Sequence, residues 1–185
     1  MPIISITGDL GSGKSTVSAI LCKQLNYDYI YTGEILRRMA EKYGMSVTEL
    51  NKYAETHPEI DEEVDSTFRS LSDASDLVVD SRLAWFFLPR SFKIYLKTDL
   101  RISAQRIIGD RNRKSEHYLS VEEAMSQIAE RKKSENKRYK DLYGADCSDL
   151  DQYDLVVDTS FLTPGQVAEV ILDAYRKWKI NSSFL

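Results

Sequence analysis

Residues 8–15 form the pattern that most restricts what this chain can fold into. They read Gly-Asp-Leu-Gly-Ser-Gly-Lys-Ser and fit the motif G-x-x-x-x-G-K-[ST]. A short β-branched run at residues 3–7 precedes them, and apolar residues at helical spacing follow at 15–25. A strand, a glycine-rich loop and a helix in this order predict a loop that cradles nucleotide phosphates, and chance produces such a motif in roughly 1% of chains of this length.

Each residue type in this loop has a chemical reason. Glycines let the backbone curl so that successive N–H groups point at phosphate oxygens, and the start of the following helix adds its positive dipole end. Lys14 is expected to contact the β- and γ-phosphates, and the Ser15 hydroxyl to ligate Mg²⁺. The predicted cofactors are therefore ATP and Mg²⁺. The predicted cofactor-binding residues of the loop are Gly8, Asp9, Gly11, Ser12, Gly13, Lys14, Ser15 and Thr16.

Strand-like and helical segments alternate along the whole chain. Strands are expected at 3–7, 27–31, 77–80, 92–96 and 155–158, and helices at 15–25, 33–43, 59–71, 99–108 and about 120–143, with capping boxes at 46–49 and 120–123 and a last helix from Pro164. Such alternation predicts an α/β fold in which a parallel sheet has helices on both faces. Two stretches, near 33–72 and 109–140, fall outside the alternation and are candidate substrate-covering insertions.

Length and composition fit one ordinary globular domain. The chain has 185 residues and a formal net charge of −4, which gives no global argument for a nucleic-acid or membrane partner. The N-terminus lacks a signal-peptide pattern, and Cys22 and Cys147 lack metal-ligand spacing, so both are expected to be reduced thiols. We therefore expect a cytoplasmic monomer.

Asp80 ends the apolar run at residues 77–80. A carboxylate at the carboxyl end of a buried strand faces the ligand crevice of an open α/β sheet. There it can hold Mg²⁺ through water, so Asp80 and Ser15 form the predicted metal site. Asp158 ends the last strand in the same manner and is expected to be structural.

Two classes of protein compete for this loop, a kinase and a nucleotide-dependent switch. Residues 96–99 read Leu-Lys-Thr-Asp, without the polar residue that a guanine-reading N-K-x-D motif requires first, and the D-x-x-G sequence at 141–144 follows in the wrong order. Phosphoryl transfer between two anions needs cations, and arginines gather in the two insertions and at one strand end. These are Arg37, Arg38, Arg82, Arg106, Arg111, Arg113, Arg131 and Arg138.

Arg131, Glu135 and Arg138 stand at i, i+4 and i+7 of the long charged helix and therefore share one face. Without nucleotides, we expect this stripe to face water, with Glu135 holding one arginine or both. With both nucleotides bound, the arginines should move onto the transferring phosphates. The neighbouring lysines alternate with acids and are expected to form a solvated face; they are Lys132, Lys133, Lys137 and Lys140.

A chain of further motifs runs in one order along the sequence. They are Thr32-Gly33-Glu34-Ile35-Leu36-Arg37, Gly44-Met45-Ser46, Pro58-Glu59-Ile60-Asp61, Asp80-Ser81-Arg82-Leu83-Ala84, Ser134-Glu135 with Arg138-Tyr139, and Tyr143-Gly144-Ala145-Asp146. With them the chain resembles, over nearly its whole length, the short archaeal-type cytidylate kinases of the nucleoside monophosphate kinase group.

The resemblance implies a fold, a reaction and further site residues. It implies a P-loop core with a five-stranded parallel sheet (about 1–31, 74–108 and 144–185), an acceptor-binding helical insertion (about 32–73) and a lid (about 109–143). It implies transfer of the ATP γ-phosphate to CMP or dCMP. Lys14, Arg82, Arg131 and Arg138 are then the catalytic residues, Thr32, Arg37, Arg82 and Glu135 contact the acceptor, and Arg111 contacts ATP.

The sequence departs from the family pattern at four places. Ser81 stands where glycine is usual, Lys132 where an acid is usual, and Leu83 where longer bacterial relatives have aspartate; residues 109–118 are longer and more basic. Most of the matching motifs support phosphoryl transfer, whereas fewer of them bear on the identity of the acceptor. A kinase for another small acceptor, or a nucleotide-binding regulatory protein without turnover, stays open as an alternative.

Overall fold

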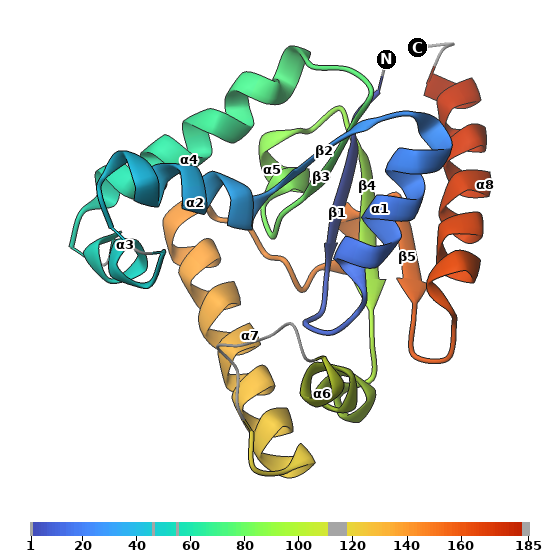
Figure 1. Cartoon of the computed structure of the whole chain (residues 1–185). Coiled ribbons are helices and arrows are strands. Elements are labelled where there is room, and N and C mark those ends of the chain that lie inside the picture. Colours follow the sequence, from blue (N-terminus) through green and yellow to red (C-terminus); the bar gives the residue numbers. More distant parts are fainter. Residues whose placement is uncertain (1, 46, 55, 111–117, 183–185) are drawn as a thin grey trace.

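A parallel sheet forms the centre of the computed structural model, which describes residues 2–45, 47–54, 56–110 and 118–182. Within these residues the sheet has five strands in the order β2-β3-β1-β4-β5, and every neighbouring pair is parallel (Figure 1). The strands are β1 (Ile4–Gly8), β2 (Asp28–Tyr31), β3 (Leu77–Asp80), β4 (Phe92–Lys97) and β5 (Leu155–Asp158). The predicted fold class is confirmed.

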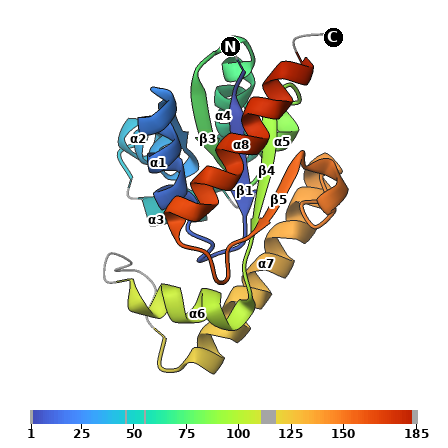
Figure 2. The ribbon, with the colours of Figure 1, turned by 90° about the vertical axis from the view of Figure 1, so that its right-hand side faces the viewer.

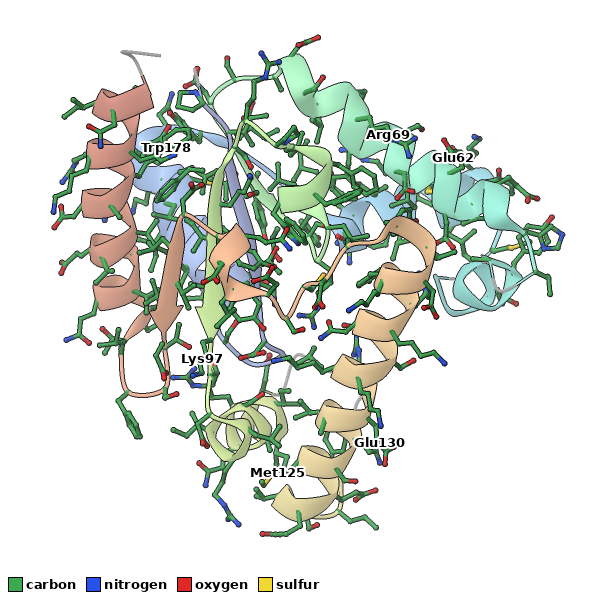
Figure 3. All side chains as sticks on the ribbon, turned by 180° about the vertical axis from the view of Figure 1, so that it is seen from behind. Glu62, Arg69, Lys97, Met125, Glu130 and Trp178 are labelled. Atoms are coloured by element: carbon green, nitrogen blue, oxygen red, sulfur yellow. The ribbon has the colours of Figure 1, made fainter. Side chains whose placement is uncertain are left out.

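Helices α1 (Lys14–Leu25) and α8 (Pro164–Ser182) cover one face of the sheet, where Figure 2 shows α8 running across it. Ile4 and Ile6 of β1 point to this face and are fully buried with the apolar side of both helices. Trp178 near the end of α8 packs against Phe92, with ring centroids 5.3 Å apart (Figure 3). Burying both faces of a parallel sheet explains why its strands read as nearly continuous apolar runs.

The opposite face carries the first insertion, formed by α2 (Thr32–Lys42), α3 (Val47–Ala54) and α4 (Pro58–Ser70), and the short helix α5 (Ala84–Phe87). Ile3, Phe68 and Val79 are among the residues that bury this second core. On the outside of α4, Arg69 pairs with Glu62 at 2.8 Å (Figure 3). Sequence periodicity missed α5, because four consecutive apolar residues show no helical period.

The predicted lid region lies below the carboxyl ends of the strands, where α6 (Leu100–Gly109) packs against α7 (Val121–Tyr143) (Figures 1 and 2). Asp99 caps α6, since its carboxylate accepts from the main-chain N–H of Arg101 at 2.9 Å. Ser120 caps α7 by accepting from the Glu123 N–H at 3.1 Å. The Ser120 cap was expected from the capping box at 120–123. Two 3₁₀ turns, Leu71–Asp73 and Leu150–Gln152, complete the described structure.

Two expectations concern residues beyond this description. The capping box expected at 46–49 begins at Ser46, which lies outside the described residues, as does the predicted ATP contact Arg111. Among the described helices, none combines the length and apolar character needed to cross a bilayer.

Candidate active site

The phosphate loop between β1 and α1 is fitted closely against β4 and α6. Gly8 has a φ of +156°, and a Cβ there would collide with the backbone of Leu96. Gly11 has a φ of +72°, and a Cβ would lie 2.8 Å from the Ser103 carbonyl oxygen. The Ser103 hydroxyl in turn donates to the Leu10 carbonyl. Positive φ and close backbone approach together require glycine at both positions.

Lys14 folds back over the loop at the start of α1. Its Nζ donates to the carbonyl oxygens of Gly8 at 3.4 Å and Asp9 at 3.3 Å. Ser15 follows it with an exposed side chain. The Ser12 Oγ is buried and has no hydrogen-bond partner among the described residues. A buried hydroxyl without a partner is costly, so its presence in a phosphate loop indicates a ligand-facing group.

A cavity of about 330 Å³ opens beside the loop, between α6 and the segment that joins β5 to α8. Arg106 forms one wall: its Nη2 donates to the Thr159 carbonyl at 2.7 Å and the Ser160 carbonyl at 3.2 Å, and its Nη1 to the Gly11 carbonyl at 3.3 Å. Leu162 contributes apolar surface. The lining includes the predicted cofactor residues Gly11, Ser12, Gly13, Lys14, Ser15 and Thr16.

Arg106 lies in a position that was not predicted from the sequence. It was grouped with arginines of the insertions and of the third strand's end, yet it lies on α6 and holds the phosphate loop to the β5–α8 segment. A usable signal was its spacing from Ser103, because residues three apart share a helix face and both contact the loop.

Asp80 lies beside the phosphate loop at the end of β3, as predicted. Its Oδ2 accepts from the Tyr29 hydroxyl at 3.2 Å. Burial raises the pKa of the carboxyl above its ordinary value, although nearby Lys14 and Ser15 favour ionisation. The structure thus brings together the two predicted metal ligands. Within the described residues there is no cluster of three or more metal-binding side chains.

Thr32 begins α2 directly after β2, and Arg37 lies midway along the same helix. The Thr32 hydroxyl donates to the Asp80 carbonyl at 3.4 Å. The Arg37 guanidinium donates to the Tyr31 hydroxyl and stands 5.2 Å from the centre of the Tyr31 ring. Tyr31 stacks on Tyr29 at 5.2 Å between centroids. This tyrosine pair was absent from the predicted site.

Arg82 connects three parts of the molecule. It follows β3, donates to the Gly8 carbonyl of the phosphate loop, and its Nε lies 3.1 Å from Glu135 Oε2 on α7. Glu135 also accepts from Arg131 Nε at 2.8 Å. The structure therefore gathers Arg82, Glu135 and Arg131, and Glu135 holds one of the two lid arginines.

Arg138 takes a different direction from the rest of the predicted stripe. Its guanidinium lies 3.5 Å from Asp61 Oδ1 on α4, and its side chain is 60% exposed. The second arginine held by Glu135 is thus Arg82 rather than Arg138. Arg138 instead bridges α7 and α4.

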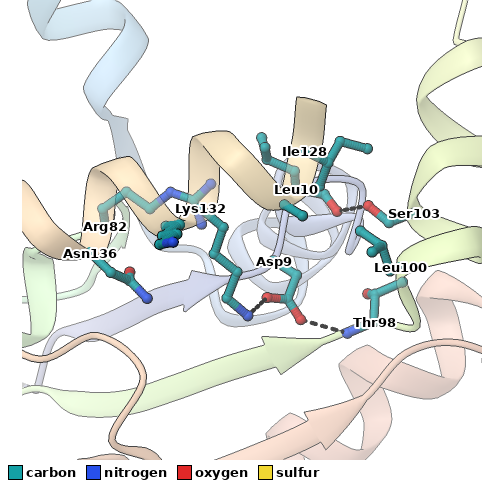
Figure 4. Close-up of a pocket in the computed structure, with 11 residues that line it drawn as sticks. Asp9, Leu10, Arg82, Thr98, Leu100, Ser103, Ile128, Lys132 and Asn136 are labelled. Atoms are coloured by element: carbon teal, nitrogen blue, oxygen red, sulfur yellow. Dashed lines mark hydrogen bonds and ion pairs between the residues drawn. The ribbon is translucent and has the colours of Figure 1, made fainter. Parts of the chain in front are cut away.

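Lys132 corrects the expectation of a solvated lysine face. Its Nζ lies 2.6 Å from Asp9 Oδ1 of the phosphate loop (Figure 4). The main-chain N–H of Asp9 donates to the Leu96 carbonyl at 2.9 Å, which ties this part of the loop to β4. Lys140, by contrast, pairs with Asp146 on the surface, with its side chain 66% exposed.

Comparison with known proteins identifies the family of this chain. A family model described as the cytidylate kinase-like family matches residues 3–161. The chain belongs to the cytidylate kinase-like family. It is 39% identical over 170 residues to a cytidylate kinase of Pyrococcus abyssi, covering 91% of each chain, and 39% identical over 176 residues to one of Sulfurisphaera tokodaii, covering 94% of each. The resemblance inferred from the motifs is confirmed.

Solved structures support the architecture. A shikimate kinase from Bacteroides thetaiotaomicron is similar with a TM-score of 0.68 at 13% identity, covering 95% of this chain and 98% of its own. A shikimate kinase from Acinetobacter baumannii has a TM-score of 0.65 at 20% identity, covering 97% and 95%. At these identities the likeness concerns the fold alone.

Proposed function

We propose that this chain transfers the γ-phosphoryl group of ATP to a nucleoside monophosphate, with CMP and dCMP as its acceptors. One observation carries the proposal. A phosphate loop with Lys14 at its end lies next to a cluster of cations, Arg82 and Arg131, that converge on a single carboxylate, Glu135. A phosphate-binding loop beside convergent arginines is what transfer between two anions requires. Membership of the cytidylate kinase-like family supports the same reaction.

The loop residues fit a nucleotide triphosphate. The buried Ser12 Oγ, without a partner among the described residues, is a donor that a phosphate oxygen can satisfy. The cavity of about 330 Å³ continues from the loop along Arg106 and Leu162, which offers a flat guanidinium and apolar surface to a base. We assign this cavity to ATP.

The residues also fit Mg²⁺ as the predicted cofactor. Ser15 and Asp80 supply a hydroxyl and a carboxylate close together, and Mg²⁺ prefers oxygen ligands from one or two protein groups together with phosphates and water. When bound, the ion neutralises charge on the phosphate oxygens. Burial raises the pKa of Asp80, and a cation beside the carboxylate would offset this by stabilising its ionised form.

The chain's own residues then act by position and charge. Lys14 binds the phosphate oxygens of ATP, and Arg82 with Arg131 and Arg138 orients the acceptor phosphate for in-line attack and stabilises the charge that spreads over the transferred group. Thr32 and Arg37 are assigned to the acceptor, and Glu135 holds the arginines in register. No side chain needs to become a covalent intermediate.

Location and assembly stay predictions. The free thiols Cys22 and Cys147 support a reducing, cytoplasmic setting. A monomer without nucleic-acid or membrane partners remains the expectation from the sequence.

An acceptor panel tests the proposal. Common nucleoside monophosphates are offered with ATP and Mg²⁺, and ADP release is followed. CMP or dCMP should give the highest kcat/KM, and Lys14→Ala should lower turnover by about 10²-fold or more, as for loss of a preorganised charge. A tenfold preference for AMP or GMP contradicts the acceptor assignment. Absence of turnover with every nucleotide favours another small acceptor or a regulatory protein.

A further inference from the structure

Asp9 places a carboxylate inside a loop whose ligand is a polyanion. The side chain is only 11% exposed. Its Oδ1 accepts from the Tyr95 hydroxyl at 2.7 Å. Its Oδ2 accepts from the Thr98 main-chain N–H at 2.9 Å (Figure 4). Burial disfavours its ionisation, but the hydrogen bonds from Lys132, Thr98 and Tyr95 outweigh it and lower the pKa of the carboxyl. Asp9 is therefore a fixed negative charge at neutral pH.

Lys132 reaches this charge from the lid helix, 123 positions along the chain. Its Nζ lies 2.6 Å from Asp9 Oδ1 and 5.9 Å from the centre of the Tyr95 ring. One turn earlier on α7, the buried Ile128 packs in the apolar contact between α7 and α6, which also takes in Leu10 of the loop. Figure 4 shows these side chains approaching the loop from the same side of α7.

The pair lines a cavity together with apolar side chains and with the further cations Arg82 and Lys133. A cavity of about 450 Å³ separates α7 from the loop and from the start of α6, and Asp9, Leu10, Leu100, Ile128 and Lys132 are among its lining residues. The Lys132 side chain extends from α7 across this cavity and pairs with the Asp9 carboxylate. A charge pair bordered by apolar side chains is screened less than one on an open surface.

We propose that Lys132 is a positioning residue for phosphoryl transfer, which neutralises Asp9 and so couples the docking of the α7 lid helix to the affinity of the loop for ATP. The inference rests on the proposed kinase function for its ligand, ATP, and for the lid role of α7. With Lys132 in place, the negative charge of the Asp9 carboxylate is neutralised where the triphosphate binds. Without it, the buried Asp9 carboxylate repels the incoming phosphates.

The competing interpretation is an ordinary surface ion pair, because the Lys132 side chain is 46% exposed and such pairs contribute little. The two ends of this pair differ, however. Asp9 is buried and accepts from three donors, so removal of Lys132 leaves a carboxylate that cannot move into water. The effect of removing Lys132 should therefore depend on the charge of Asp9.

Equilibrium binding of a non-hydrolysable ATP analogue, measured by calorimetry without acceptor, tests the proposal. Lys132→Ala should weaken ATP-analogue binding about tenfold, which is a loss of about 1.4 kcal/mol of binding free energy. The exposed Lys137→Ala, five positions along the same helix, is the matched control and should bind as the wild type does. Lys132→Arg should retain most of the affinity.

The double variant Asp9→Asn, Lys132→Ala decides between the two interpretations. An asparagine at position 9 can still accept from the Thr98 N–H and donate to the Tyr95 hydroxyl, but it carries no charge. Binding should return to within about twofold of the wild type, because a coupled pair is non-additive. Thermal unfolding of each variant reports whether it is folded.

Two results overturn the inference: Lys132→Ala binding like Lys137→Ala, or a folded double variant binding as weakly as Lys132→Ala. The readout is separate from turnover. If the wild type binds the analogue but phosphorylates no nucleoside monophosphate, the proposed function fails. The Lys132 variants then still show whether the Asp9–Lys132 pair controls ATP binding. If the wild type binds no ATP analogue, both fail.

Discussion

At the scale of single residues, Ser12 and Ser91 make a matched pair. Both hydroxyls are buried, but Ser12 Oγ has no partner in the described structure, whereas Ser91 Oγ donates to the Leu88 carbonyl at 2.7 Å and contacts Ser5 Oγ at 2.8 Å. Replacing an unsatisfied buried hydroxyl is nearly neutral, while breaking a buried hydrogen bond costs about 1–3 kcal/mol.

We therefore predict opposite outcomes for the two alanine variants. Ser12→Ala should leave the melting temperature unchanged or higher and weaken ATP binding, because the hydroxyl serves the ligand. Ser91→Ala should lower the free energy of unfolding and leave ATP binding intact. Thermal unfolding and nucleotide titration of both variants check this. A large loss of stability in Ser12→Ala would show that the hydroxyl has a structural partner.

Asp80 gives a second prediction at this scale. Because burial raises its folded-state pKa above the unfolded value, the group adds stability below the unfolded pKa and loses it as pH rises through the folded pKa. At neutral pH the ionised carboxylate is therefore a cost to the fold. Asp80→Asn should raise the melting temperature at pH 7, with the gain shrinking in acid, and should lower turnover with Mg·ATP. Melting curves at several pH values decide; a variant that is less stable at pH 7 contradicts the sign.

At the scale of elements, the α7 helix carries the lid arginines toward different partners. Arg131 is held by Glu135 and Arg138 by Asp61 of α4, and both arginine side chains are more than half exposed. Arg131→Ala or Arg138→Ala should lower kcat by about 10²-fold or more and change ATP binding far less, since their charge acts chiefly in the transition state.

The controls for the lid come from the same helix. Glu135→Ala should be milder than either arginine variant and should mainly weaken acceptor binding, while Lys133→Ala and Lys137→Ala should behave as the wild type does. Steady-state kinetics on these variants measure the difference. Arginine variants that match the lysine controls would reduce the stripe to a solvated helix face.

Elements also mark how far sequence reasoning reaches. Period and capping predicted the strands and the long helices, because each signal lies within about a dozen neighbouring residues. α5 was missed because one short apolar turn has no period. The contacts of Arg82 with Glu135 and of Asp9 with Lys132 join segments 53 and 123 positions apart, and only the folded chain brings them together. Lys132 was misjudged for that reason.

At the scale of the whole molecule, the parallel sheet sets where chemistry can occur. The carboxyl ends of β1 and β3 carry the phosphate loop, Asp80 and Arg82, and the two insertions lie next to each other beside this edge, where α7 meets α4 (Figure 1). Ligands of an open α/β sheet bind at the carboxyl ends of its strands, so the position of Asp80 at this edge was predictable from the sequence. The proposed acceptor contacts depend instead on side-chain directions, such as that of Arg37 in α2 toward Tyr31 of β2, which the sequence leaves open.

The central claim is a transfer of phosphate from ATP to a nucleoside monophosphate, and ³¹P NMR of one reaction mixture tests it most directly. The purified chain is incubated with ATP, Mg²⁺ and CMP, and the phosphorus signals are followed together. We predict that the ATP γ-phosphate signal is replaced by the β-phosphate signal of CDP, in equal amount to the ADP formed, with little free phosphate. ADP accompanied by inorganic phosphate, with CMP unchanged, would contradict the account.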